Sequence, residues 1–201
     1  MLAMTRRRFG ALSGVAALVA GAVPTVSLAL SDGEARALVD RLVAEINRVI
    51  GSGKSERAMY QEFERIFARY SDSSYIAAYT LGNDGRRATA AQKKAYSAAF
   101  ETYVAHKYGR RFREFAGGRL EVSGVKAVKK WFEVSAVAYL NGQAPFDVTF
   151  LVSNRSGSNK FFNLYIEGIN MLLTERTEIG AMLDRRRGDI DALIADLRAA
   201  V

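Results

Sequence analysis

Between residues 31 and 115 the apolar side chains recur every three or four positions, a spacing that predicts amphipathic helices. In the first of these stretches Leu38, Leu42 and Ile46 fall on one face. Capping residues such as Ser31 and Thr89 mark where helices begin, and glycines mark where they end. We predict four helices here, over residues 32–50, 55–70, 72–82 and 90–115.

After Gly118 the period of the pattern changes to two residues, which is typical of β-strands. Short turns at residues 141–142 and 156–158 join successive strands, so we expect an antiparallel meander. Gly168 breaks the last strand, and Asn170 can cap the helix that follows it. The predicted strands cover residues 119–126, 129–140, 146–154 and 160–167, and the predicted closing helices cover residues 171–183 and 189–199.

Helices, then strands, then helices again indicate an α+β fold, in which helices cover one face of a curved antiparallel sheet of four to five strands. Both faces of this sheet are apolar, whereas one face normally meets solvent. One explanation is an apolar cavity between sheet and helices, with space left by the small Ala136 and Ala138; the other is an ordinary packed core. The face expected to point inward carries Phe132, Val134, Ala136, Ala138, Leu140, Phe146, Val148, Phe150, Val152, Phe162, Leu164 and Ile166, and the other face carries Trp131, Val137, Tyr139, Leu151, Phe161 and Tyr165.

The first 29 residues have the features of an export signal. Arg6 and Arg7 stand just before the apolar Phe9, which matches the twin-arginine pattern, and an uncharged stretch rich in Ala, Gly and Val follows. Residues 27–29 offer a small-x-small cleavage site, so we expect the exported chain to begin at Leu30. An uncleaved N-terminal anchor is the alternative. We expect one domain, over residues 30–201.

The net charge of the sequence is +8, from 29 basic and 21 acidic residues. Three of the basic residues lie in the export signal, so the exported chain would carry a mild +5. Basic runs at residues 110–113 and 185–187 suit the negative ends of helices, and contact with lipid phosphate is the alternative. We expect no nucleic-acid partner, because the export signal weighs heavily against one.

The sequence offers few groups for catalysis or metal binding. It has no cysteine and a single histidine, His106, which excludes thiolate metal sites and nearly all histidine-based triads. Glu133, Asp147 and Glu167 lie in predicted strands, but nothing fixes two of them at a catalytic distance. The competing hypothesis is an enzyme with a cone-shaped α+β fold that acts on a small apolar substrate, and it requires a titratable group in the cavity.

Residues 165–169 (Tyr-Ile-Glu-Gly-Ile), followed by Arg176 and a short closing helix, resemble the C-terminal signature of the MlaC-type periplasmic phospholipid carriers. These carriers are the soluble component of the Mla (maintenance of lipid asymmetry) pathway. The family commonly has a Trp-x-x-x-Asp-x-x-x-Glu-Gly-like strand here, and Phe161 and Asn163 stand near its Trp and Asp positions. Residues 72–82 resemble the family's short helix from an aspartate to a Leu-Gly pair.

The resemblance implies a periplasmic carrier, not an enzyme, that holds the acyl chains of a phospholipid between sheet and helices, with the headgroup near solvent. It implies two partners: an outer-membrane lipoprotein complex and an inner-membrane ABC transporter with MCE-domain subunits. We expect a monomer with phospholipid as its cargo and with no cofactor. The residues that we expect to contact lipid are Phe132, Val134, Ala136, Ala138, Val148, Phe150, Leu164 and Ile166 on the strands, and Phe100, Tyr103 and Met171 on the helices.

Overall fold

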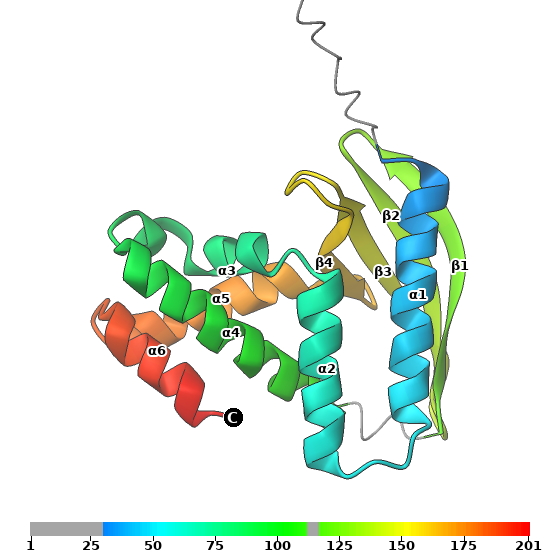
Figure 1. Cartoon of the computed structure of the whole chain (residues 1–201), viewed down its shortest axis with the longest axis horizontal. Helices are drawn as coiled ribbons and strands as arrows, with labels where there is room; N and C mark the ends of the chain where they lie inside the picture. The colour runs from blue at the N-terminus through cyan, green and yellow to red at the C-terminus, as the bar shows by residue number, and fades with distance from the viewer. Residues whose placement is uncertain (1–29, 112–116) are drawn as a thin grey trace, which may run out of the picture.

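The computed structural model describes residues 30–111 and 117–201 (Figure 1). Within these residues the chain forms six α-helices, one short 3-10 helix and a five-stranded sheet. The predicted export signal and the end of the predicted fourth helix lie outside the described residues. The helices are α1 (Asp32–Ile50), α2 (Glu56–Tyr70), α3 (Ser73–Leu81), η1 (Gly82–Arg86), α4 (Ala90–Arg111), α5 (Met171–Arg185) and α6 (Ile190–Ala199).

Polar side chains fix the starts of most of the helices at the residues that the sequence marks, whereas Ser55 at the start of α2 makes no side-chain capping bond. Ser31 accepts a hydrogen bond from the backbone N–H of Glu34, whose carboxylate accepts one from the backbone N–H of Ser31, which completes a capping box. Asp72, Asn170 and Asp189 cap α3, α5 and α6 through one such bond each. All six predicted helices are present, although the third ends at Leu81 rather than Gly82 and residues 112–115 of the predicted fourth helix lie outside the described part.

The strands form one antiparallel sheet in which spatial order follows sequence order, as the short connections predict. A fifth strand of two residues follows a tight turn in which Glu167 and Gly168 have positive φ angles of 50° and 78°. The prediction that the fourth strand extends through Glu167 is therefore wrong, because Glu167 belongs to the turn. The strands are β1 (Arg119–Val128), β2 (Trp131–Tyr139), β3 (Phe146–Ser153), β4 (Lys160–Ile166) and β5 (Ile169–Asn170).

A β-bulge in β4 corrects the predicted inward face. Leu151 pairs with Asn163 and Val152 pairs with Phe161, so Phe162 is an extra residue with no opposite partner. Because the bulge shifts the alternation by one residue, Phe161 belongs to the main hydrophobic core, where its ring meets the Phe150 ring edge-on at 5.9 Å. The alternation pattern alone predicts this role for Phe162, and that prediction is wrong.

Helices cover one face of the sheet. α1 lies along the sheet and α2 beside it, while α3 to α6 form a second group next to β4 (Figure 1). The inward residues Val134, Ala136 and Ala138 are almost fully buried, whereas Trp131 and Val137 on the opposite face are half-buried. The predicted α+β fold is thus confirmed. Among the described residues, no helix combines the length and the apolar character needed to cross a membrane.

Candidate functional site

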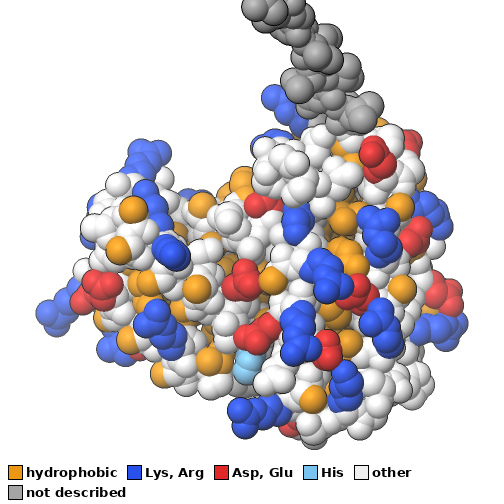
Figure 2. Space-filling model, viewed as in Figure 1, with side chains coloured by type: hydrophobic (Ala, Val, Ile, Leu, Met, Phe, Trp, Pro, Cys, Tyr) orange, Lys and Arg blue, Asp and Glu red, His pale blue; other side chains and the backbone are white. Residues whose placement is uncertain are grey.

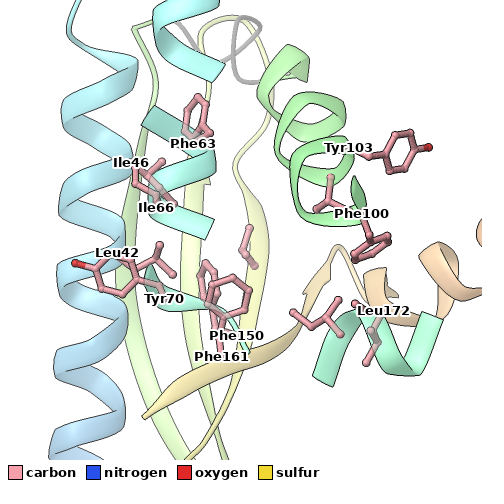
Figure 3. Close-up of a cluster of buried hydrophobic side chains, with 14 of the residues drawn as sticks. Leu42, Ile46, Phe63, Ile66, Tyr70, Phe100, Tyr103, Phe150, Phe161 and Leu172 are labelled. Atoms are coloured by element: carbon pink, nitrogen blue, oxygen red, sulfur yellow. The ribbon is translucent and has the colours of Figure 1, made fainter. Parts of the chain in front are cut away.

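A cavity of about 520 Å³ lies between the inward face of the sheet and the helices. Helices α1 to α5 and strands β1 to β4 all contribute to its wall, which is mostly aliphatic and aromatic. Leu42, Ile46 and Ile66 lie on one side of this region, and Phe100 and Leu172 lie on the other (Figure 3). The volume falls within the range of about 300–1,000 Å³ that is common for small-molecule pockets. Of the two explanations for the apolar sheet, the structure thus supports a cavity.

Most of the residues expected to contact lipid lie in the wall of this cavity. Three strands and two helices bring them together, and the antiparallel register aligns them: Val148 lies opposite Ile166, and Phe150 lies opposite Leu164. The expected residues that line the cavity are Ala138, Val148, Phe150, Leu164, Ile166, Phe100 and Met171.

The structure places the other expected residues outside the cavity wall. Val134 and Ala136, 0% and 1% exposed, belong to the packed core, because α1 packs directly on β1 and β2. Phe132, nearer the β1–β2 turn, packs against the same core. Tyr103 points away from the cavity (Figure 3), and its hydroxyl donates a 2.6 Å hydrogen bond to Glu178.

The sequence analysis did not identify the part of the wall that α1 and α2 supply. These residues belong to the apolar stripes of the two helices, and such a stripe has the same spacing whether it faces a cavity or a packed core. No signal in the sequence separates the two cases. The residues are Leu42 and Ile46 of α1 and Phe63, Ile66 and Phe67 of α2.

One end of the cavity opens toward solvent at the β2–β3 loop. Gln143 and Ala144 of that loop and Glu167 of the β4–β5 turn are exposed, and all three line the cavity. They lie at the same end of the sheet, because the Glu167 backbone N–H donates a 2.9 Å hydrogen bond to the carbonyl of Asp147 at the start of β3. Farther along the strands, toward Phe161, the wall is mostly apolar, and the buried Asn163 and Glu175 are its polar members. The cavity therefore has a polar mouth and a mostly apolar interior.

Two asparagines hold the start of α5 against β4. The Asn163 side-chain oxygen accepts hydrogen bonds from the backbone N–H groups of Leu164 and Leu172, at 2.8 and 3.0 Å, and Asn170 caps the N–H of Leu173. The Asn163 amide also donates to the Asn170 side chain at 3.0 Å. These bonds fix where the first turns of α5 meet the cavity.

The two stretches that carry the resemblance meet in space. Arg176 of α5 donates a 3.0 Å hydrogen bond to the carbonyl of Tyr79 in α3, and its guanidinium lies 5.0 Å from the centre of the Tyr79 ring. Gly82 allows this approach, since a Cβ atom there would lie 2.9 Å from the guanidinium of Arg176. The motif residues of α3 and α5 therefore fix the position of α5, which forms one wall of the cavity.

A buried carboxylate, which the sequence analysis did not identify, also forms part of the wall. Glu175 is 4% exposed, and its Oε1 accepts hydrogen bonds from Lys107 Nζ at 2.8 Å and from the Tyr108 hydroxyl. Lys107 also binds Glu178, which lies nearer solvent. Burial by itself lowers the pKa of Lys107, but hydrogen bonds and charge attraction from the two glutamates outweigh it, so the pKa is raised and the ammonium stays charged.

The carboxylates considered for catalysis do not come together. Glu133 and Asp147 lie on the face of the sheet opposite the cavity, and Glu167 lies at the mouth. Within residues 30–111 and 117–201 there is no cluster of His, Cys, Asp and Glu that could hold a metal ion. No two of these three carboxylates therefore form a catalytic pair, and the described residues offer no metal centre.

On the face of the molecule shown in Figure 2, positive charge is spread rather than concentrated. On the face shown in Figure 2, Lys and Arg side chains alternate with Asp and Glu. Lys54 pairs with Glu62 at 2.7 Å, and Arg186 pairs with Asp196 at 2.6 Å, where it joins the end of α5 to α6. The side chains of residues 110–113 lie outside the described part. On this face the alternation of charge is unlike a nucleic-acid surface.

Comparisons with known proteins agree with the fold and the motifs. A family model described as MlaC protein matches residues 36–199. Among solved structures, the phospholipid-binding protein from Ralstonia solanacearum, in complex with a phospholipid, has a similar fold, with a TM-score of 0.70 and 16% sequence identity. The match covers 83% of this chain and 96% of that chain. The matched family is not an enzyme family. Because its model spans nearly all of the described domain, this chain belongs to the MlaC family.

Proposed function

We propose that this chain is a phospholipid carrier of the periplasm, which holds acyl chains in the cavity and shuttles lipid between the outer and inner membranes. The observation that carries the proposal is an apolar cavity of about 520 Å³ in a member of the MlaC family. The bound phospholipid of the Ralstonia solanacearum protein, which shares the fold, supports the same assignment. Glu175 is the titratable group in the cavity that the enzyme alternative requires, so an assay for turnover is needed to separate the two functions.

The size of the hydrophobic effect explains why a carrier needs such a cavity. At about 0.8 kcal/mol for each buried methylene, two acyl chains with about thirty methylenes would cost about 25 kcal/mol to place in water. A dry cavity that is nearly as apolar as the bilayer interior lets the carrier extract the lipid from a membrane and release it again. A much tighter site would retain the lipid, and a wetter one would not extract it.

In the proposed complex the lipid has one orientation. The acyl chains run from the mouth toward Phe150 and Phe161, in contact with Ala138 and Ile166 of the strands and with Phe100 of α4. The headgroup stays at the mouth, near Gln143, where the wall is polar and exposed. In this arrangement the polar part of the lipid meets solvent and the apolar part does not.

The route to the periplasm and the partners form part of the same proposal. Residues 1–29 serve as a twin-arginine signal, and residues 30–201 form the carrier domain, which acts as a monomer. The carrier exchanges lipid with an outer-membrane lipoprotein complex and with an inner-membrane ABC transporter that has MCE-domain subunits. Membership of the MlaC family supports these partners.

Mass spectrometry of an organic extract tests the proposal. The protein is purified from the periplasm of bacteria without detergent, and its extract is compared with that of an unrelated periplasmic protein purified in parallel. We expect intact phospholipid in the carrier extract alone. A folded preparation without phospholipid would overturn the carrier function, and steady hydrolysis of added phospholipid would favour the cone-fold enzyme instead.

A further inference from the structure

Three phenylalanines close the end of the cavity that lies opposite the mouth. The Phe161 ring of β4 meets the Phe150 ring of β3 edge-on, with 5.9 Å between the ring centres, and the two lie together in Figure 3. The Phe67 ring of α2 also meets the Phe161 ring edge-on, at 6.0 Å. All three residues line the cavity, so the Phe161 ring joins its sheet wall to its α2 wall.

The cavity stops at the level of Phe161. Val152 lies opposite Phe161 in the sheet and is 0% exposed, but it does not line the cavity. Tyr70, which follows Phe67 by one helical turn, is also buried and also lies outside the cavity wall. Both residues belong to the hydrophobic core. Among the described residues, the cavity therefore ends at these rings, and packed core begins behind them.

Backbone contacts hold this closed end in place. Ser71, just after α2, forms an isolated parallel bridge with Phe161, and the backbone N–H of Asp72 donates a 2.7 Å hydrogen bond to the Phe161 carbonyl. The Lys160 ammonium donates a hydrogen bond to the carbonyl of Arg69 near the end of α2. These bonds join the start of β4 to the segment between α2 and α3, so the Phe161 ring has a fixed place at the end of the cavity.

The closed end gives the cavity a definite depth. β3 runs from Phe146, which lines the cavity next to the mouth loop, to Val152 opposite Phe161. At about 3.4 Å per residue, this part of the strand spans about 20 Å. A chain that is too long for this depth leaves methylenes near water at the mouth, whereas a membrane would keep them dry. Each such methylene lowers the uptake of the lipid about fourfold.

We propose that the Phe161 ring is the stop for the ends of the acyl chains and sets the longest chain that the carrier takes up from a membrane. The inference rests on the proposed carrier function and adds acyl-chain length to it. A smaller side chain at position 161 should deepen the cavity by the volume of the atoms removed. Because protein interiors are close-packed, Phe161→Leu frees room for about three carbons of acyl chain and Phe161→Ala for about six.

Uptake from mixed vesicles tests the length limit. The purified protein, freed of its lipid, is equilibrated with vesicles that contain a series of phosphatidylcholines differing only in the length of their two acyl chains. Mass spectrometry then measures which lipids the protein has taken up. We expect uptake by the wild type to fall steeply above one chain length. Equal uptake at all lengths would overturn the inference and leave the carrier function intact, whereas no uptake of any lipid would overturn both.

Two variants at position 161 test the residue. Phe161→Ala should move the limit toward longer chains, by about six carbons summed over both chains, and the milder Phe161→Leu by about three. Phe132→Ala is the matched control, because Phe132 packs against the same core from β2 but does not line the cavity. The control should keep the wild-type limit. An unchanged limit in a folded Phe161→Leu variant would show that Phe161 does not stop the chains.

Discussion

At the scale of single residues, Ala136 and Ala138 separate cavity from core. They are two positions apart on β2 and both almost fully buried, yet only Ala138 lines the cavity. Ala136→Trp should destabilise the lipid-free protein by about 1–3 kcal/mol, the usual cost of overpacking a core. Ala138→Trp has space to fill, so it should cost much less and should abolish lipid binding. Thermal unfolding and lipid content of the two variants check this; equal losses of stability in both would contradict the assigned wall.

The Glu178–Lys107 pair predicts how stability depends on pH. Burial alone raises the pKa of Glu178, but hydrogen bonds from Lys107 and Tyr103 and the charge of Lys107 outweigh it, so the pKa lies below the ordinary 4.5. A carboxylate of this kind stabilises the folded state above its unfolded pKa, and the contribution disappears as the pH falls through the folded pKa. Glu178→Gln should therefore lower the melting temperature near neutral pH, and the difference should shrink well below pH 4.5. A difference that is constant across this range would refute the pairing.

At the scale of elements, Gly82 determines how closely α3 and α5 approach. Its φ of +59° is unfavourable for other residues, and a Cβ atom would meet Arg176. Gly82→Ala should cost about 1–3 kcal/mol in unfolding free energy. Gly85→Ala is the matched control four residues from the end of α3, since its Cβ would make only ordinary contacts of 3.5 Å or more with Leu81. Denaturant unfolding of both variants measures the difference, and equal stabilities would mean that α5 does not depend on this contact.

The sequence predicts the elements better than the way they face each other. Capping residues predict the helix starts at Ser31, Asp72 and Asn170. Short turns and the two-residue alternation of apolar side chains predict the antiparallel meander. All of these are local features of the sequence. The bulge at Phe162 depends on pairing across β3 and β4, so the alternation pattern alone misassigned it. Glu175 was overlooked for a similar reason: only the folded arrangement of the helices brings Lys107 of α4 to it, 68 positions away in the sequence.

At the scale of the whole molecule, the proposed carrier function requires export of the chain to the periplasm. Replacement of Arg6 and Arg7 by lysine should prevent accumulation in the periplasm, because the twin-arginine route reads the arginine pair. Cell fractionation checks this, with Arg8→Lys as the control that leaves the pair intact. Unchanged amounts of periplasmic protein that begins at Leu30 would exclude the twin-arginine route and leave the carrier domain as described.

The central claim is that one folded chain encloses phospholipid in the cavity between sheet and helices. Native mass spectrometry of the intact protein, purified from the periplasm, measures this most directly, because it weighs the chain together with what it holds. We expect a single chain whose mass exceeds that of residues 30–201 by a whole phospholipid, and we expect Ala138→Trp to show the bare chain. A wild-type protein that is folded and carries no added mass, or an Ala138→Trp variant that carries as much lipid as the wild type, would contradict the account.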